Sequence, residues 1–385
     1  MHYGSWGHDV GRPKEEVLDG LTARDISYYG NSSLREILDI ESPSALLFLS
    51  MPIIQMAFNR YAIAKDIPTC HLYHGFVSVQ ATADGQLSSK PNLIRQLNFV
   101  IRRAYKNIVL IIPVYIRALI ETRASLDLWF DFAREIIVKV KGRRRAGKVL
   151  KGAVTTIGCV YANADVLHMR KNYGIKQEHI YVVGNPDLIY FGVTKEDIGS
   201  AWNDFNLNNL VTYVDTCYLD AGAHFASEDD FVAHILSTSM NISSMGLELC
   251  VKLHPAHYKT SVPRKIRSNG IKLISNDAFV QTLRKSKFAI VEPSTAALIP
   301  GLLGLPIFLA QYGNLRDKQY GEVLMSYPRS QLLVSFSLIS ELLKTMSDAS
   351  NRNAFEKWVA QNIGPIPARD MPKRVADILA SLCAN

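Results

Sequence analysis

The stretch V-K-L-H-P-A-H-Y, residues 251–258, shows how the second half of the chain is built. It closes the expected strand 248–253, whose mostly apolar interior, from Leu249 on, is typical of a strand buried on both faces. Pro255 ends the run, so His254 is expected at the carboxyl end of that strand. Parallel sheets collect their binding groups at this end, and a histidine there can donate a hydrogen bond or a proton near neutral pH.

Strands and helices alternate on both sides of this stretch. Alternation of this kind predicts a doubly wound parallel sheet with helices on its faces. The expected strands are 210–214, 248–253, 271–274, 288–291 and 306–309, and the expected helices are 229–239, 278–285 and 295–303.

The first half shows a similar but weaker alternation, which ends before a linker-like segment at 191–208. Residues 1–40 are polar and rich in turn residues and offer no opening strand, so either the first sheet is minimal or a segment precedes it. The expected strands are 44–50, 68–73, 153–160 and 180–183, the expected helices are 57–64 and 164–172, and two or three more helices are expected in 91–150.

A length of 385 residues exceeds what one hydrophobic core usually supports, so two domains are expected. We place the first at residues 1–190, with a basic helical insert at 91–151, and the second at residues 191–385, with helices at its C-terminal end. The apolar fraction of 48% and the charged fraction of 20% exclude a disordered or fibrous protein.

Cysteine usage and hydropathy favour a cytoplasmic protein. The five cysteines are widely spaced and form no C-x-x-C pair, so we expect them to be reduced and buried, without a disulfide or zinc. No secretory signal follows Met1. The most apolar windows, 45–58 and 108–120, are shorter than the roughly 20 apolar residues of a membrane-spanning helix or are interrupted.

The net charge of +8 is concentrated in one segment. Residues 139–151 carry seven basic side chains and no acidic one, and 97–120 intersperses apolar residues with basic ones. This pattern suits peripheral contact with an anionic membrane, although a solvated basic helix and loop explains it too. No nucleic-acid-binding module is recognisable. The expected membrane contacts are Lys139, Lys141, Arg143, Arg144, Arg145 and Lys148.

A second motif, A-I-V-E-P-S-T-A-A-L at 289–298, runs from strand through turn to helix. Ser294 and Thr295 fall at the start of that helix, where hydroxyls and free N–H groups can bind an anion. A plain helix cap is the alternative. Together with His254 on a nearby strand end, the motif predicts a nucleoside phosphate site.

These motifs resemble the C-terminal half of bacterial GT-B glycosyltransferases of capsule and lipopolysaccharide synthesis, including CMP-sugar enzymes that transfer Kdo or sialic acid. Y-G-I-K-Q-E-H-I-Y-V-V-G-N-P-D (173–187) and I-P-T-C-H-L-Y-H-G-F (67–76) resemble other parts of that fold. The resemblance implies an α/β fold of the GT-B type, with two Rossmann-like domains facing each other across a cleft. It also implies a donor nucleotide site made by Lys252, His254, Pro255, Glu292, Ser294 and Thr295.

Departures from the family pattern bear on the donor. The helix after Thr295 lacks the acidic residue with which UDP-sugar enzymes hold the ribose, which favours CMP over UDP. The implied reaction moves Kdo or a related ulosonic acid to a surface glycan or glycolipid. A UDP-sugar transferase, a UDP-sugar 2-epimerase and a non-catalytic subunit of a polysaccharide assembly complex remain alternatives.

The groups that perform the transfer remain a shortlist. Asp215 and Asp220 follow the first strand of the second domain, and His74 follows a strand of the first, so each could activate the acceptor or act as nucleophile. His254 could protonate the leaving group. The acidic D/E-D/E-G element of some sialyltransferases is missing. No D-x-D stands beside the donor turn, so neither a metal nor a cofactor is expected.

Overall fold

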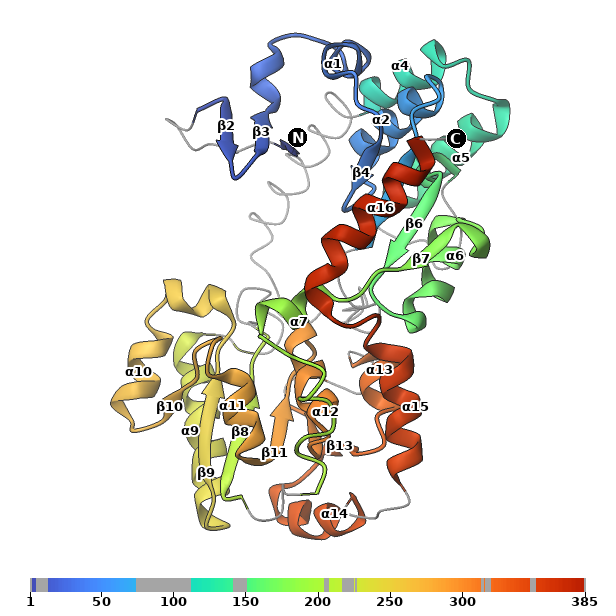
Figure 1. Cartoon of the computed structure of the whole chain (residues 1–385). Coiled ribbons are helices and arrows are strands. Elements are labelled where there is room, and N and C mark those ends of the chain that lie inside the picture. Colours follow the sequence, from blue (N-terminus) through green and yellow to red (C-terminus); the bar gives the residue numbers. More distant parts are fainter. Residues whose placement is uncertain are drawn as a thin grey trace.

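The computed structural model describes residues 2–4, 13–73, 112–140, 151–203, 208–216, 225, 227–312, 315, 320–346 and 351–383. These residues form two parallel sheets flanked by helices, together with one small sheet near the start of the chain (Figure 1). The expected α/β class, with two Rossmann-like sheets in series, is confirmed.

The small sheet is the main departure from expectation. Strands β1 (His2–Gly4), β2 (Glu15–Leu18) and β3 (Leu21–Asp25) lie in the order β1-β3-β2, and β2 and β3 form an antiparallel hairpin. The sequence showed no strand here because the strands are short and carry charged residues. Since this sheet is separate, the first parallel sheet opens with a later strand, as the sequence indicated.

The first parallel sheet has the order β4-β5-β6-β7, with every pair parallel. Each expected strand is present, although shorter than expected. The elements are β4 (Leu46–Phe48), α2 (Ile53–Ile63), β5 (Thr69–Leu72), α4 (Ile112–Glu121), α5 (Leu126–Val140), β6 (Ile157–Val160), α6 (Val166–Tyr173) and β7 (Ile180–Val182), preceded by α1 (Leu34–Glu41). Helices α4 and α5 lie within the expected helical region 91–150; its remaining parts, 91–111 and 141–150, are outside the described residues.

The second sheet has the order β10-β9-β8-β11-β12-β13, again with every pair parallel. All five expected strands are present. The sixth, β13, was missed because S-Q-L-L is partly polar and lies at the edge. The strands are β8 (Leu210–Val214), β9 (Glu248–Lys252), β10 (Lys272–Leu273), β11 (Ser286–Val291), β12 (Ile307–Ala310) and β13 (Ser330–Leu333).

Helices cover both faces of this sheet. They are α9 (Glu228–Ser244), α10 (Val262–Ser268), α11 (Phe279–Arg284), α12 (Leu298–Leu303), α13 (Gly321–Met325), α14 (Ile339–Met346) and α15 (Arg352–Asn362). The central strands are buried on both faces, which is why their sequences are nearly continuous apolar runs. This packing fixes the positions of the strand ends.

The linker-like segment 191–208 is packed where it is described. The Gly199 and Ala201 N–H groups donate to the carbonyls of Leu302 and Leu303 at 2.8 Å each, and Trp202 is buried. Residues 204–207 lie outside the described part. These contacts attach the segment to α12, one of the helices that cover the second sheet.

The last helix, α16 (Met371–Cys383), returns to the first sheet (Figure 1). Met371 and Val375 pack in one cluster with Cys70 and Leu72 of β5. The sequence alone grouped this helix with residues 191–385, since nothing local shows on which sheet an amphipathic helix packs.

The chain passes between the two sheets at Gly184 and again at Gly364. These glycines have φ values of +102° and +72°. A Cβ atom on Gly364 would lie 2.1 Å from the Tyr161 carbonyl oxygen and 3.0 Å from the Gly184 Cα, so the two passages touch.

Three cysteines, Cys70, Cys159 and Cys250, are free and buried as expected, whereas Cys383 is exposed at the end of α16. Cys217 is outside the described residues. Within the described part of the chain, no helix has the length and apolar character that a membrane span requires.

Candidate functional site

The strand order of the second sheet locates the candidate site. Numbered along the chain, the order is 3-2-1-4-5-6, as in dinucleotide-binding Rossmann sheets. The strand order reverses between β8 and β11, although all six strands are parallel, and ligands of such sheets bind beyond the carboxyl ends of the strands at this point. The segments following β8, β9 and β11 carry Asp215, His254 and Glu292.

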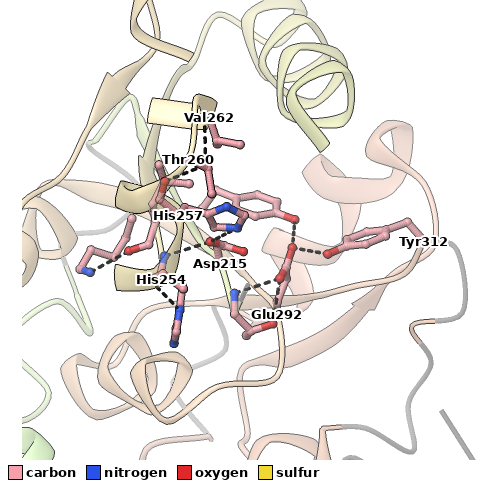
Figure 2. Close-up of polar contacts among 12 residues, drawn as sticks. Asp215, His254, His257, Thr260, Val262, Glu292 and Tyr312 are labelled. Atoms are coloured by element: carbon pink, nitrogen blue, oxygen red, sulfur yellow. Dashed lines mark hydrogen bonds and ion pairs between the residues drawn. The ribbon is translucent and has the colours of Figure 1, made fainter. Parts of the chain in front are cut away.

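Asp215 is buried and holds the turn that follows β9. Its Oδ2 atom accepts a hydrogen bond from the His254 backbone N–H at 2.9 Å and lies 3.2 Å from Nε2 of His257 (Figure 2). Only 3% of the residue is exposed. Through these two contacts, the Asp215 carboxylate holds the His-Pro turn in place.

His257 was not singled out from the sequence, although it is the second histidine of H-P-A-H. Its ring is buried and stacks on Phe231 of α9, with ring centres 4.8 Å apart and planes at 7°. The contact connects α9, the turn after β9 and Asp215. The spacing of three residues, which places both histidines in one helical turn, was the available signal.

His254, by contrast, has an exposed side chain. It caps the short helix Pro255–Lys259, and its Nδ1 atom accepts a hydrogen bond from the Ala256 N–H at 3.2 Å. Because Nδ1 accepts, a neutral ring carries its proton on Nε2. The backbone thus selects the tautomer in which the outer nitrogen is a donor. Pro255 beside it is exposed.

Lys252 lies on β9, with its side chain buried beneath this turn. Its Nζ donates to the Leu253 carbonyl at 3.1 Å and lies 5.8 Å from the ring centres of Phe191 and Phe279. Burial lowers the pKa of its ammonium group, and Asp215 acts in the opposite direction. The side chain therefore faces the protein interior.

Glu292 is fully buried, and four donors surround its carboxylate. Oε1 accepts from the hydroxyls of Tyr213, at 2.5 Å, and Tyr312; Oε2 accepts from the N–H and hydroxyl of Thr216, at 3.0 Å each. Figure 2 shows the carboxylate between Tyr312 and the segment after β8. Burial, followed by the nearby Asp215 charge, raises its pKa to about 7, against the effect of these hydrogen bonds. Glu292 thereby joins the ends of β8, β11 and β12.

Aromatic rings extend this network toward α9. His234 of α9 lies 3.3 Å from the Tyr213 hydroxyl through Nε2, and its ring centre is 4.3 Å from that of Tyr312 and 5.3 Å from that of Phe225. Burial lowers the pKa of His234 to about 4, so its ring is neutral at physiological pH. The sequence gave no periodic signal for this cluster, because its members come from four separate segments.

Ser294 and Thr295 follow Glu292, where the sequence placed them. The Ser294 hydroxyl accepts from the Ala297 N–H at 3.2 Å and so caps the short helix Thr295–Ala297, which leads into α12. This is the capping role that the sequence left open, and it leaves the hydroxyl proton able to donate. The Thr295 hydroxyl makes no hydrogen bond to any described residue.

Several predicted residues cannot be located. His74, Asp220 and the basic residues Lys141, Arg143, Arg144, Arg145 and Lys148 lie outside the described residues, and of Lys139 only the backbone, within α5, is described. Among the residues that are described, no group of three or more His, Cys, Asp or Glu side chains is arranged to hold a metal ion.

The described residues next to His74 form a second polar cluster, on the first sheet. The ring of His71, on β5, lies 4.3 Å from that of Tyr173, and Tyr73 lies 5.1 Å from His168. Burial, and then the His168 charge, lower the pKa of His71 to about 4. Its buried Nδ1 has no hydrogen-bond partner within the described part of the chain.

Solved structures of a glycosyltransferase, a UDP-GlcNAc 2-epimerase and a wall teichoic acid polymerase are similar in fold to this chain. The calicheamicin glycosyltransferase CalG4 shares 13% identity at a TM-score of 0.44, with 91% of this chain and 78% of that one covered. The UDP-GlcNAc 2-epimerase from Neisseria meningitidis shares 13% identity at a TM-score of 0.43, covering 93% and 85%. The wall teichoic acid polymerase TagF shares 11% identity at a TM-score of 0.44, covering 96% and 78%.

These similarities are weak both in sequence identity and in structural superposition. The ligands of those proteins are therefore not assigned to this chain. No protein-family model matches the chain, and no curated protein sequence matches it. Any function therefore has to be argued from the site itself.

Proposed function

We propose that the chain is a glycosyltransferase that holds a nucleotide-activated sugar at the carboxyl edge of the second sheet. The observation that carries the proposal is the position of His254 and of Ser294-Thr295. They lie at the ends of β9 and β11, on either side of β8, around the point where the strand order reverses. A Rossmann sheet binds the phosphates of its nucleotide at this place.

In this proposal, the exposed groups touch the donor and the buried groups position them. The Nε2–H of His254 donates to a phosphate oxygen, and the hydroxyls of Ser294 and Thr295 supply further donors. Asp215 and Glu292 are buried, and their carboxylates accept hydrogen bonds from the protein, so neither is exposed to the donor as His254 is. Lys252 supports the turn from beneath, and Pro255 limits its backbone freedom.

The geometry separates Asp215 from the other candidate catalytic residues. Asp215 is buried and accepts a hydrogen bond from the His254 backbone, so we assign it a positioning role. Asp220 and His74 then remain the proposed groups that activate the acceptor, and His254 the group that stabilises the leaving nucleotide.

For the donor we propose a CMP-activated sugar, with Kdo or a related ulosonic acid as the transferred group and without a metal ion. The helical segment that directly follows Thr295, A-A-L-I-P-G at 296–301, carries no acidic residue, which supports this choice over UDP. A UDP-sugar transferase or 2-epimerase is the second candidate, because the same strand ends would hold either diphosphate or monophosphate.

The test is a thermal-shift series with CMP, CDP, UDP and GDP on the wild type, His254→Ala and the control His179→Ala, whose histidine is exposed elsewhere. A ligand present at about 100 times its Kd stabilises the native state by about 2.7 kcal/mol, which is readily measured. We expect CMP to raise the Tm of the wild type and of His179→Ala but not of His254→Ala.

Each other outcome has a defined meaning. A shift with UDP alone would remove the CMP assignment but leave a nucleotide site. No shift with any nucleotide, or an equal shift in His254→Ala, would contradict the proposed site. Binding of CMP without turnover of any CMP-sugar would favour the non-catalytic subunit.

A further inference from the structure

Three large apolar side chains are exposed within residues 120–130, at the end of α4 and in the first turns of α5. Ile120 is 61% exposed, Leu126 76% and Phe130 74%. We call these three residues, with Arg123 and Arg134, the α4–α5 patch. Figure 1 shows both helices at the outer edge of the unit built on β4–β7. Grouped exposure of large apolar residues, unlike single instances, marks an interaction surface.

Helix α5 is apolar on two faces. Leu128 and Phe132 are buried in the core of the first unit. Leu126 and Phe130, four residues apart, share another face, and the exposed Ala133 continues it. Because the core already uses the first face, the apolar character of the second is not explained by folding of the described residues.

The charge on this surface is positive. Arg123 precedes α5 and Arg134 follows Phe130 by one helical turn; both are exposed, and neither has an ion-pair partner in the described part of the chain. The acidic neighbours are engaged. Lys151 contacts Asp127 through Nζ at 2.5 Å and Asp131 through its N–H at 2.9 Å, and Glu121 pairs with Arg117 at 2.6 Å.

We propose that the α4–α5 patch docks on an anionic lipid surface. Apolar side chains enter the interface between headgroups and acyl chains, while arginines beside them contact lipid phosphates. A symmetric contact between two copies fits less well, because it would bring the arginines of both copies together. In the sequence, α5 runs into the basic segment 139–151. The charge of this segment is positive, as is that of the α4–α5 patch.

The inference does not depend on the proposed glycosyltransferase activity, since it uses other residues and needs no turnover. The experiment is co-flotation of the full chain with vesicles of phosphatidylcholine alone or of phosphatidylcholine with phosphatidylglycerol. We expect binding to the anionic vesicles only, and weaker binding at high salt because the charges are exposed.

Two pairs of variants separate the apolar and the charged contributions. Phe130→Ser should weaken the vesicle affinity by about tenfold or more, since it removes most of the insertion energy of one aromatic side chain. Met240→Ser, at a residue 68% exposed on α9, is its control. Arg134→Glu should have a comparable effect, whereas Arg267→Glu, the same charge change on an exposed residue of α10, should not.

Because all four sites are exposed, the variants should keep the Tm of the wild type, which a melting curve verifies. No flotation of the wild type would overturn the proposal. So would equal binding of Phe130→Ser and Met240→Ser. Light scattering tests the remaining case, self-association. If the wild type is a dimer that does not bind vesicles, and Phe130→Ser is a monomer, the patch is a self-association surface instead.

Discussion

The Tyr213 hydroxyl donates a 2.5 Å hydrogen bond to the Glu292 carboxylate, although 79 residues separate the two in sequence. The register of the sheet explains the contact. Val214 pairs with Val291, so the residues at the ends of β8 and β11 lie side by side. The same register brings Asp215 close enough to Glu292 to raise its pKa.

The raised pKa of Glu292 gives the protein a specific pH dependence. Its folded-state pKa is about 7, whereas that of a glutamate in open solvent is 4.5. The stability that the protonated group contributes is therefore complete below about pH 4.5 and is lost as the pH rises through about 7. The loss is on the order of 3 kcal/mol, at about 1.4 kcal/mol per unit.

Glu292→Gln should remove this dependence, because the amide does not titrate. Urea unfolding at pH 5 and pH 7.5 measures it. Relative to Glu292→Gln, we expect the wild type to lose about 1–3 kcal/mol between these two pH values. Glu248→Gln, at an exposed position on β9, is the control. A difference between wild type and Glu292→Gln that is the same at both pH values would contradict the assignment.

The two histidines of H-P-A-H should behave oppositely on substitution. His257→Ala removes a ring stacked in the core and leaves Asp215 buried beside a cavity, so we expect a loss of about 3 kcal/mol or more. His254→Ala removes an exposed ring and one capping hydrogen bond, which costs about 1 kcal/mol or less.

Chemical denaturation of the two variants at neutral pH provides the comparison. If His254→Ala proved the more destabilising, the assignment of one histidine to the site and the other to the core would be wrong.

The contact between Gly364 and Gly184 can be tested with a matched pair of substitutions. Gly364 and Gly246 have φ values of +72° and +71°, so alanine incurs the same backbone strain at either position, about 1–2 kcal/mol. A methyl group at Gly246 meets no atom within 4 Å, whereas at Gly364 it meets the Tyr161 carbonyl.

Gly364→Ala should therefore be less stable than Gly246→Ala by about 1–3 kcal/mol, the usual range for overpacking. Urea midpoints with unchanged m-values would report this difference directly. Equal stabilities would show that the passage at Gly364 opens without resistance.

The sequence predicted the second sheet well because its strands are buried on both faces. Leu210–Val214, for example, is bounded by polar residues, and its apolar run has the length of the strand. The small sheet of β1–β3 and the edge strand β13 escaped prediction because these strands are short and carry polar residues, so they contain no such run. Their pairing is decided by tertiary neighbours.

The candidate site was predictable only in its local parts. His254 and Ser294 occupy turns that sequence motifs identify, and the structure places them at the ends of β9 and β11, with β8 between the two strands. Tyr213, His234 and Tyr312 could not be found in this way. Each lies in an ordinary apolar or amphipathic segment, and only the strand order brings the three together around Glu292.

The touching passages at Gly184 and Gly364 have a mechanical consequence. With a single connecting segment, the two units could rotate relative to each other in any direction. Two connecting segments of the chain that touch each other restrict this rotation, because twisting one unit against the other would stretch one of the two segments. Arg374 reinforces this restriction by donating to the Val183 carbonyl at 2.6 Å and to the Pro367 carbonyl at 2.5 Å. We therefore expect the two sheets to open and close about one axis.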